Sequence, residues 1–430
     1  MRTGLEFGLL HGAAVVAACL LCVAALWPLL GAPMLYDDSQ VVAKDRYVAA
    51  VWEGRADVRG IFGRLWYQSR PVRLLTHRAD ALVFGKSLVG PHAENLLLHL
   101  AAGLLFASAL GAMGVGKGVR VAALAIFLVH PVCVESVGIL SHRKELLSAL
   151  WMMAALRASL SRKAVWRGMA AAFLFLAVFS KETAAVFPAL WALAVWERGR
   201  GEGGGKKWSG TIWRRAVFWV AASAGLAALA WWQIRQGMEI LHTDPSLDMN
   251  RAGHFGGGAP WGVCWSAAIR SFPRYLLAFL TPWGHVVDPV FSLQEGLWSW
   301  RTLLALGVGA GYGAGLLALW RRRSRAFAPA AWIPAALAPY LFPPKKHRGH
   351  FFTIDPEERD DVILNNPNWK FEGIAYYVLK EPGEGTVPVY RFWSKGYKHH
   401  FYTMDENEKD DLIRTNPNWT YEKIAFYAIP

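Results

Sequence analysis

The sequence predicts a multispanning α-helical membrane protein that ends in a small α+β domain made of two repeats. Three observations lead to this prediction. Hydrophobic residues make up 54% of the 430 residues, and 22 residues are tryptophan. Several apolar stretches reach the length of about 20 residues that a helix needs to cross a bilayer. A pattern that begins at His350 returns at His400, so the last part of the chain is internally duplicated.

The first apolar stretch runs from Phe7 to Leu30 and is interrupted only by His11. It is too long for a cleaved signal peptide and lacks the small-residue cleavage pattern, so we expect a retained signal-anchor helix. A polar and aromatic segment, residues 34–91, follows as the first external loop and opens with YDDSQVV. Later apolar runs lie at 93–113, 119–140, 145–160, 166–180, 183–196, 213–233, 300–320 and 326–343.

Basic residues predict the orientation of these runs. The chain has a net charge of +14, and its positive excess lies in residues 1–344, whose Lys and Arg gather in connections at 113–120, 157–167, 197–215 and 321–325. Because such connections stay in the cytoplasm, residues 34–91 are expected outside, and the basic blocks do not indicate a nucleic-acid partner. The run 266–282 contains Arg270 and Arg274 and is expected to lie in the interface or to re-enter, which leaves about nine crossings. The tail then lies outside; the opposite parity would place it in the cytoplasm.

We divide the chain into a membrane domain, residues 1–344, and a repeat domain, residues 345–430. HFFTIDPEERDDVILNNPNWKFEGIAYY and HFYTMDENEKDDLIRTNPNWTYEKIAFY are the two copies. In each copy the His-Phe-aromatic-Thr sequence predicts a strand, Asp-x-x-Glu predicts the start of a short capped helix, and Asn-Pro-Asn predicts a turn before a second strand. One copy is too small to bury a core alone, so the two are expected to pack as one domain.

Ionisable residues in or beside apolar helices are costly and therefore mark candidate sites. Under the predicted orientation many of them lie at or near the outer ends of helices. For any single one, a structural explanation such as a helix cap, a snorkelling side chain or a satisfied histidine is favoured. Their gathering on one side favours a functional site. They are Asp37, Asp38, Arg70, His77, His92, Glu94, His99, His130, Glu135, Arg143, Glu145, Lys181 and Glu182.

Four stretches in this order carry a family resemblance: YDDSQVV, SRPVRLLTHRADALVFGKSLVGPHAENLLLH (69–99), HPVCVESVGILSHRKELLSAL (130–150) and FSKETAAVFPAL (179–190). FPRYLLAFLTPWGHVVDP (272–289) matches more loosely. Over about residues 1–342 the chain resembles the GT-C fold glycosyltransferases that use polyprenyl-phosphate sugars. The most similar branch is the transmembrane O-mannosyltransferases with tetratricopeptide repeats, together with their bacterial relatives. The tetratricopeptide array itself is not present, and the duplicated tail follows instead.

The resemblance implies that an acidic residue of the first external loop acts on the acceptor or binds a metal. Asp37 or Asp38 is the expected base for an acceptor hydroxyl, and adjacent carboxylates raise each other's pKa. A capping or solvated acidic pair is the structural alternative. The leaving phosphate of a lipid-linked sugar needs cations, for which Arg143 and Lys181 come first and Arg70 next. Supporting or sugar-contacting roles are expected for the remaining candidates, which are His99, His130, Glu135, Glu145 and Glu182.

The sequence thus predicts transfer of a sugar, possibly mannose, from a polyprenyl-phosphate donor to a protein, lipid or glycan hydroxyl outside a bacterial cytoplasmic membrane. Dependence on a divalent cation is left open, because the sequence has no regular metal-binding spacing. The tail resembles the HFYT-type repeats of bacterial extracytoplasmic proteins; Tyr390, Trp393, Trp369 and Trp419 either contact carbohydrate or form its core, and the core is favoured. The alternatives are a membrane-anchored surface-binding protein and a lipid or solute transporter, although the paired broken helices of transporters do not occur.

Overall fold

The structure is a computed structural model of the full chain. It describes residues 2–35, 38–43, 45–56, 58–63, 70–201, 210–243, 261–280, 298–322, 324, 327–337, 351–365, 378–394, 399–415 and 419–429. The chain divides into two compact units. Unit 1 comprises residues 1–240 and 314–339, and unit 2 comprises residues 241–313 and 340–430.

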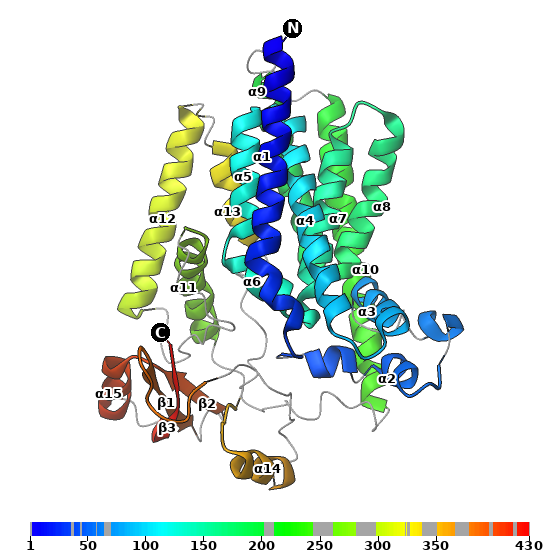
Figure 1. The fold of residues 1–430 in the computed structure, drawn as a ribbon. Coiled ribbons are helices and arrows are strands. Elements are labelled where there is room, and N and C mark those ends of the chain that lie inside the picture. Colours follow the sequence, from blue (N-terminus) through cyan, green and yellow to red (C-terminus); the bar gives the residue numbers. More distant parts are fainter. Residues whose placement is uncertain are drawn as a thin grey trace. The chain divides into compact units, whose positions relative to one another are not determined.

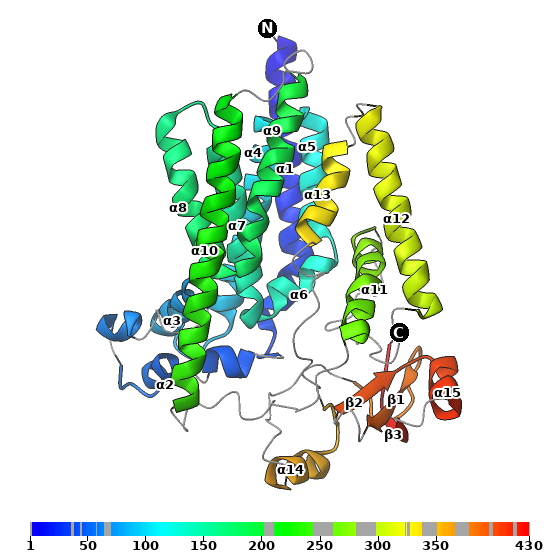
Figure 2. The same ribbon diagram turned by 180° about the vertical axis from the view of Figure 1, so that it is seen from behind.

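Unit 1 is a bundle of helices (Figures 1 and 2). Its α-helices are α1 (Arg2–Leu26), α2 (Arg46–Trp52), α3 (Pro71–Phe84), α4 (Val89–Ala112), α5 (Lys117–Val129), α6 (Val132–Gly138), α7 (Arg143–Ser159), α8 (Ala164–Ser180), α9 (Phe187–Gly201), α10 (Gly210–Thr243) and α13 (Phe327–Leu337). Single turns connect several of them: η1 (Trp27–Gly31), η2 (Ser39–Ala43), η3 (Val58–Phe62), η5 (Leu140–His142) and η6 (Glu182–Val186).

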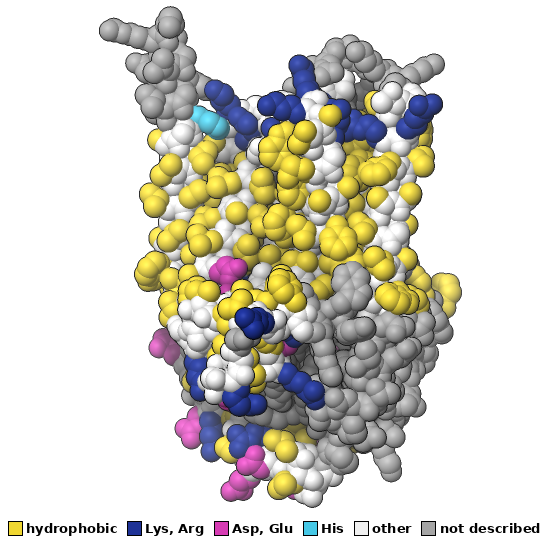
Figure 3. All heavy atoms as spheres, turned by 90° about the vertical axis from the view of Figure 1, so that its right-hand side faces the viewer, with side chains coloured by type: hydrophobic (Ala, Val, Ile, Leu, Met, Phe, Trp, Pro, Cys, Tyr) yellow, Lys and Arg dark blue, Asp and Glu magenta, His cyan; other side chains and the backbone are white. Residues whose placement is uncertain are grey.

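The bundle has two chemically different ends. At one end lie α2, α3, α6, η5 and η6, and we call this the α3 end (Figure 1). At the other end lie the α4–α5 connection, the α7–α8 connection and the C-terminus of α9, and we call this the basic end. Figure 3 shows a broad apolar band along the helices, with Lys and Arg side chains gathered along its edge at the basic end.

Four described helices are long and apolar enough to cross a membrane: His11–Gly31, Val89–Ala112, Gly210–Gln233 and Trp300–Arg321. A fifth span results if α5 and α6 count as one segment, which bends by 58° between them. The expected crossing number of about nine is therefore not reached among the described residues. Two helices that were expected to cross are not among the candidate spans. Helix α8 is apolar but has only 17 residues, and α7 begins with the charged sequence Arg-Lys-Glu.

The two largest apolar clusters of unit 1 hold most of its helices together. The larger one joins α7, α8, α9 and α10 and contains Trp191, Phe187 and Phe179, all of which are almost fully buried. The smaller one joins α1, α4 and α5 through residues such as Leu124 and Leu128, which have no exposed surface. Full burial of a large apolar side chain contributes about 1.5–3 kcal/mol, so these clusters fix the helices that carry the polar residues.

Unit 2 contains α11 (Trp261–Leu280), most of α12 (Trp300–Arg321) and the tail. The run that was expected to be interfacial or re-entrant is part of α11, a continuous 20-residue helix that is not among the candidate spans. It packs against α12, where the hydroxyls of Ser266 and Thr302 lie 2.8 Å apart and the rings of Phe272 and Tyr312 meet edge to face.

The tail forms a three-stranded antiparallel sheet in the order β2-β1-β3, with β1 (Val387–Ser394), β2 (His399–Thr403) and β3 (Thr420–Ala428). Helices α14 (Pro356–Asn365) and α15 (Glu406–Thr415) begin after Asp355 and Asp405, whose carboxylates accept backbone N–H bonds as helix caps. Both capped helices are as predicted, and so are both strands of the second copy.

The first copy differs from this prediction, because residues 351–353 are not a strand. The copy has no described counterpart of β1, so its segment lacks the neighbour with which β2 pairs. Instead, the hydroxyl of Tyr402 holds this segment through both backbone groups of Phe352, at 2.8 and 2.9 Å. The predicted second strand of the first copy lies mostly outside the described residues, apart from a bridge between Leu379 and Tyr427.

Candidate functional site

Asp38 lies at the α3 end and is fully buried. Its Oδ2 accepts hydrogen bonds from the backbone N–H groups of Leu35 (3.0 Å) and Leu140 (3.2 Å), and its Oδ1 accepts one from Ser141 (2.6 Å). Three donors to one carboxylate tie the first loop to η5 and the start of α7. This placement makes Asp38 a structural anchor. Asp37 lies outside the described residues.

Arg143 has no exposed surface and is surrounded by acceptors. Its Nε donates to Asn95 Oδ1 (2.7 Å), and its Nη2 donates to the carbonyl of Pro91 (2.8 Å). Its Nη1 donates to Asp80 Oδ2 (2.6 Å) and Glu94 Oε2 (3.0 Å). The guanidinium therefore joins α3, α4 and α7, and in this arrangement a phosphate group has no access to it. The sequence suggested that Arg143 binds the phosphate of the sugar donor, and this geometry does not support that role.

Arg70 stands at the start of α3 and pairs with Glu182 from η6. Two parallel hydrogen bonds join them, from Arg70 Nη2 to Glu182 Oε1 (2.9 Å) and from Nε to Oε2 (3.2 Å). Burial raises the pKa of Glu182, but the hydrogen bonds from Arg70 outweigh burial and hold that pKa below its ordinary value. The pair is therefore charged at neutral pH.

The backbone of Arg70 is unusual as well. Its φ of 59° is the only positive φ of a non-glycine residue among the described residues, and Pro71 follows directly. A residue before proline avoids helical conformations, and a left-handed one costs free energy. The pairing with Glu182 and the start of α3 stabilise this conformation. Strained residues of this kind gather at binding and catalytic sites, so Arg70 is a strong site candidate.

Lys181 ends α8 and pairs with Glu145 from the first turn of α7. Sequence reasoning named Lys181 and Arg70 but missed two further cations, Arg73 and Lys144. Burial, together with the charges of Arg70, Arg73 and Lys181, lowers the pKa of Lys144 to about 8, although Glu145 opposes this. Arg70, Arg73 and Lys181 therefore each lie close enough to Lys144 to repel it.

We call Arg70, Arg73, Lys144 and Lys181 the cation cluster. Two of its cations pair with carboxylates, Lys181 with Glu145 and Arg70 with Glu182. The signal for Arg73 is present in the sequence: Arg70, Arg73, His77 and Asp80 follow one another at intervals of three, four and three residues, which places them on one face of a helix. Lys144 carries no comparable signal, since its position depends on which way α7 turns.

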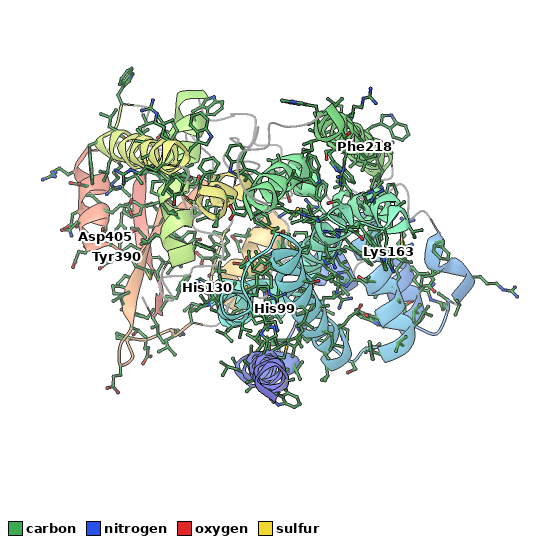
Figure 4. The ribbon with its side chains drawn as sticks, turned by 90° about the horizontal axis from the view of Figure 1, so that it is seen from above. His99, His130, Lys163, Phe218, Tyr390 and Asp405 are labelled. Atoms are coloured by element: carbon green, nitrogen blue, oxygen red, sulfur yellow. The ribbon has the colours of Figure 1, made fainter. Side chains whose placement is uncertain are left out.

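The remaining predicted residues lie elsewhere at or near this end. Glu135 Oε1 lies 3.2 Å from His142 Nδ1, and His130 Nδ1 accepts from the backbone N–H of Val132 at 3.2 Å. His99 is buried among helices, where Nε2 lies 3.1 Å from the carbonyl of Leu128 and its ring stacks on Phe127 (Figure 4). These contacts are local and structural, and none of them brings the three side chains into the cation cluster.

In the part of the chain that the structure describes, no group of three His, Cys, Asp or Glu side chains is placed to hold a metal ion. The divalent cation stays a prediction. In the tail, Tyr390 and Trp419 are 8% and 5% exposed and pack with Phe392 and Phe401. The burial of Tyr390 and Trp419 favours a core role for these two residues over carbohydrate contact. Trp393 is half-buried, and Trp369 lies outside the described residues.

Comparison with known proteins informs only the C-terminal part. Residues 320–429 match a family model described as a domain of unknown function (DUF5648). No curated protein and no solved structure matches the chain. The match covers about a quarter of the chain and includes both tail repeats. The cation cluster lies entirely outside it.

Proposed function

We propose that the protein transfers a sugar from a polyprenyl-phosphate donor to a hydroxyl acceptor at the α3 end of unit 1. The observation that carries this proposal is the cation cluster at the α3 end, where Arg70, Arg73 and Lys181 lie close enough to Lys144 to lower its pKa. A lipid-linked sugar presents its phosphate at that depth of the membrane. The resemblance of residues 1–342 to GT-C glycosyltransferases supports the same reading.

In this proposal the cation cluster binds the donor phosphate. The acceptor oxygen attacks the anomeric carbon, the bond from that carbon to the phosphate oxygen breaks, and the phosphate leaves with the electron pair. Arg70, Arg73, Lys144 and Lys181 stabilise the charge that develops on it. Arg offers paired hydrogen bonds to phosphate and Lys a compact charge. Glu145 and Glu182 hold two of these cations in place through the contacts described above.

The acceptor proton needs a carboxylate within hydrogen-bond reach. Asp38 is buried and accepts three backbone hydrogen bonds, which suits a group that positions the loop. We therefore assign the base to Asp37, as one of the two residues predicted from sequence, and the anchoring role to Asp38. The acceptor is a protein, lipid or glycan hydroxyl, and the sugar is a hexose such as mannose.

The proposed orientation places the α3 end outside and the basic end in the cytoplasm of a bacterial cell. This follows the rule that Lys- and Arg-rich connections stay in the cytoplasm. About nine crossings then require α7, α8, α9 and α13 to cross as well as the four or five candidate spans. In this orientation the tail repeats are extracytoplasmic.

The test is transfer of labelled sugar from polyprenyl-phosphate donors by the full chain in lipid, comparing wild type with Asp37→Asn and Asp38→Asn. We expect Asp37→Asn to abolish transfer without loss of folded protein. Asp38→Asn is expected to reduce the amount of folded protein first. Full transfer by folded Asp37→Asn contradicts the assignment of the base. No transfer by folded wild type with any common donor favours an anchored surface-binding protein.

A further inference from the structure

A second polar cluster at the α3 end is buried and is not used by the proposed reaction. Asp80 Oδ2 and Glu94 Oε2 both accept hydrogen bonds from the same nitrogen of Arg143, at 2.6 and 3.0 Å. Because both oxygens contact this nitrogen, the two carboxyl groups lie close to each other. Two carboxylates in one site repel each other, and this repulsion favours a proton on one of them.

A small cavity adjoins this pair. Its volume of about 10 Å³ is at the lower limit of the space that one water molecule needs, and both Asp80 and His77 line it. His77 is 1% exposed, and neither ring nitrogen has a hydrogen-bond partner in the structure. Its Nδ1 lies 3.9 Å from Asp80 Oδ2, which is too far for a direct hydrogen bond. A separation of this kind between buried polar atoms suits a bridging water.

We propose that Asp80, Glu94 and His77 form a buried proton-binding site, in which the two carboxyl groups share one proton at neutral pH and one water joins Asp80 to His77. With that proton, Arg143 faces a single negative charge and the cluster is electrically balanced. Without it, two carboxylates compete for one guanidinium. The side chain of Glu94 is 34% exposed, so it provides the route by which the proton exchanges with solvent.

The surrounding charges agree with this assignment. Burial, and then the hydrogen bond with Glu94, raise the pKa of Asp80 to about 8, although Arg143 opposes the rise. Burial, together with Arg143, Arg73 and Lys144, lowers the pKa of His77 well below its ordinary value. A neutral imidazole can donate to a water with one nitrogen and accept with the other. The site does not depend on the proposed transfer reaction.

Infrared spectroscopy of the full chain in lipid nanodiscs tests the shared proton. At pH 7 the wild type is expected to show the carbonyl stretch of a protonated, buried carboxyl group. Either Asp80→Asn or Glu94→Gln removes this band, because the carboxyl that remains has Arg143 to itself and ionises. Glu53→Gln, at an exposed residue, is the control and leaves the band unchanged. A band that is absent from wild type, or that survives either substitution, overturns the proposal.

A titration of wild type alone covers the case in which these variants do not fold. The band is expected to disappear with a midpoint near pH 8, and a band that does not change up to pH 10 overturns the assignment to this pair.

His77→Phe tests the bridging water. The substitution removes the nitrogen that holds the water, so the band should shift in position while it keeps its intensity. An unshifted band overturns the bridging water.

Discussion

The two ends of unit 1 use arginine in opposite ways. At the basic end, Arg198 and Arg215 donate to the last carbonyls of the α7 region, on Leu160 and Ser159, at 2.5 and 2.6 Å. Positive side chains at a helix C-terminus satisfy free carbonyls and interact favourably with the helix dipole. At the α3 end, Arg70 and Arg143 instead face carboxylates. The free carbonyls and the dipole of a helix C-terminus are enough to explain Arg198 and Arg215.

The second set needs another explanation. Burying charged pairs is costly, and a helix end does not require four cations and several carboxylates. Counting basic residues at helix ends therefore does not locate a site. The useful observation is the kind of acceptor that each cation contacts, a backbone carbonyl at the basic end and a carboxylate at the α3 end.

The largest loss of stability is expected when Arg143 is replaced. Arg143→Met leaves Asp80, Glu94 and Asn95 buried without their donor, and removal of one partner from a buried ionic network costs about 3–5 kcal/mol. Arg198→Met at the basic end is the matched control and should cost about 1 kcal/mol or less. Thermal unfolding of both variants in detergent measures the difference. Equal costs would contradict the contrast between the two ends.

Asp38→Asn is expected to destabilise the fold by about 3 kcal/mol, because the amide presents N–H groups where backbone donors need an acceptor. The effect should be local, with faster hydrogen exchange at Leu140 and Ser141. Glu53→Gln on the exposed surface provides the control. Unchanged exchange at these two backbone amides would show that Asp38 does not anchor the loop.

An arginine of the tail, Arg391, also pairs with a carboxylate. Arg391 is 4% exposed and binds Glu358 through two hydrogen bonds, at 2.7 and 3.0 Å, while Lys423 adds a third contact. Burial raises the pKa of Glu358, but these hydrogen bonds outweigh burial and lower it to about 2. Glu358→Gln should therefore destabilise the tail by about 2 kcal/mol at pH 7.

The pH dependence of this effect follows from the sign of the shift. A lowered folded-state pKa gives stability that is present above the unfolded pKa of about 4.3 and is lost as pH falls toward about 2. The difference between wild type and Glu358→Gln should vanish over that range, measured by proteolysis of the tail in the full chain. Glu408→Gln, at the equivalent residue of the second copy, should cost less, since its cation partner Arg301 lies 3.6 Å away.

A smaller effect is expected from the protonation of Lys144. Its pKa of about 8 means that it loses its charge as pH rises through that value. Binding of a phosphate ligand at the cation cluster should therefore weaken several-fold between pH 7 and pH 9. Lys144→Arg keeps the charge and should abolish most of this dependence. The same pH dependence in both proteins would remove Lys144 from the site.

The sequence predicts the helices and the alternation of the chain between two ends, because apolar length and basic connections are local signals. It therefore places Arg70, Arg143, Lys181 and Glu182 at one end. It does not predict which cation meets which carboxylate, since this depends on the rotation of α3 and α7 about their axes. The burial of Asp38 and Arg143 was for the same reason not predictable.

In the tail, too, some features could be predicted from local sequence and others could not. Two capped helices follow from Asp-x-x-Glu at Asp355 and Asp405, since a cap is read from adjacent residues. The loss of the first copy's opening strand at residues 351–353 depends on the strand pairing of the whole sheet. The number of crossings was the least predictable quantity, because hydropathy does not show where each helix begins and ends. Helix α8, for example, has only 17 residues.

Binding of a short-chain polyprenyl phosphate to the full chain in nanodiscs tests whether the cation cluster holds the donor phosphate. The double variant Arg73→Gln with Lys144→Gln is compared with Arg198→Gln combined with Arg215→Gln, so that each loses two positive charges from one end. The account predicts about tenfold or greater loss of affinity for the first variant and almost none for the second. Equal loss in both variants, or no loss in the first, would contradict it.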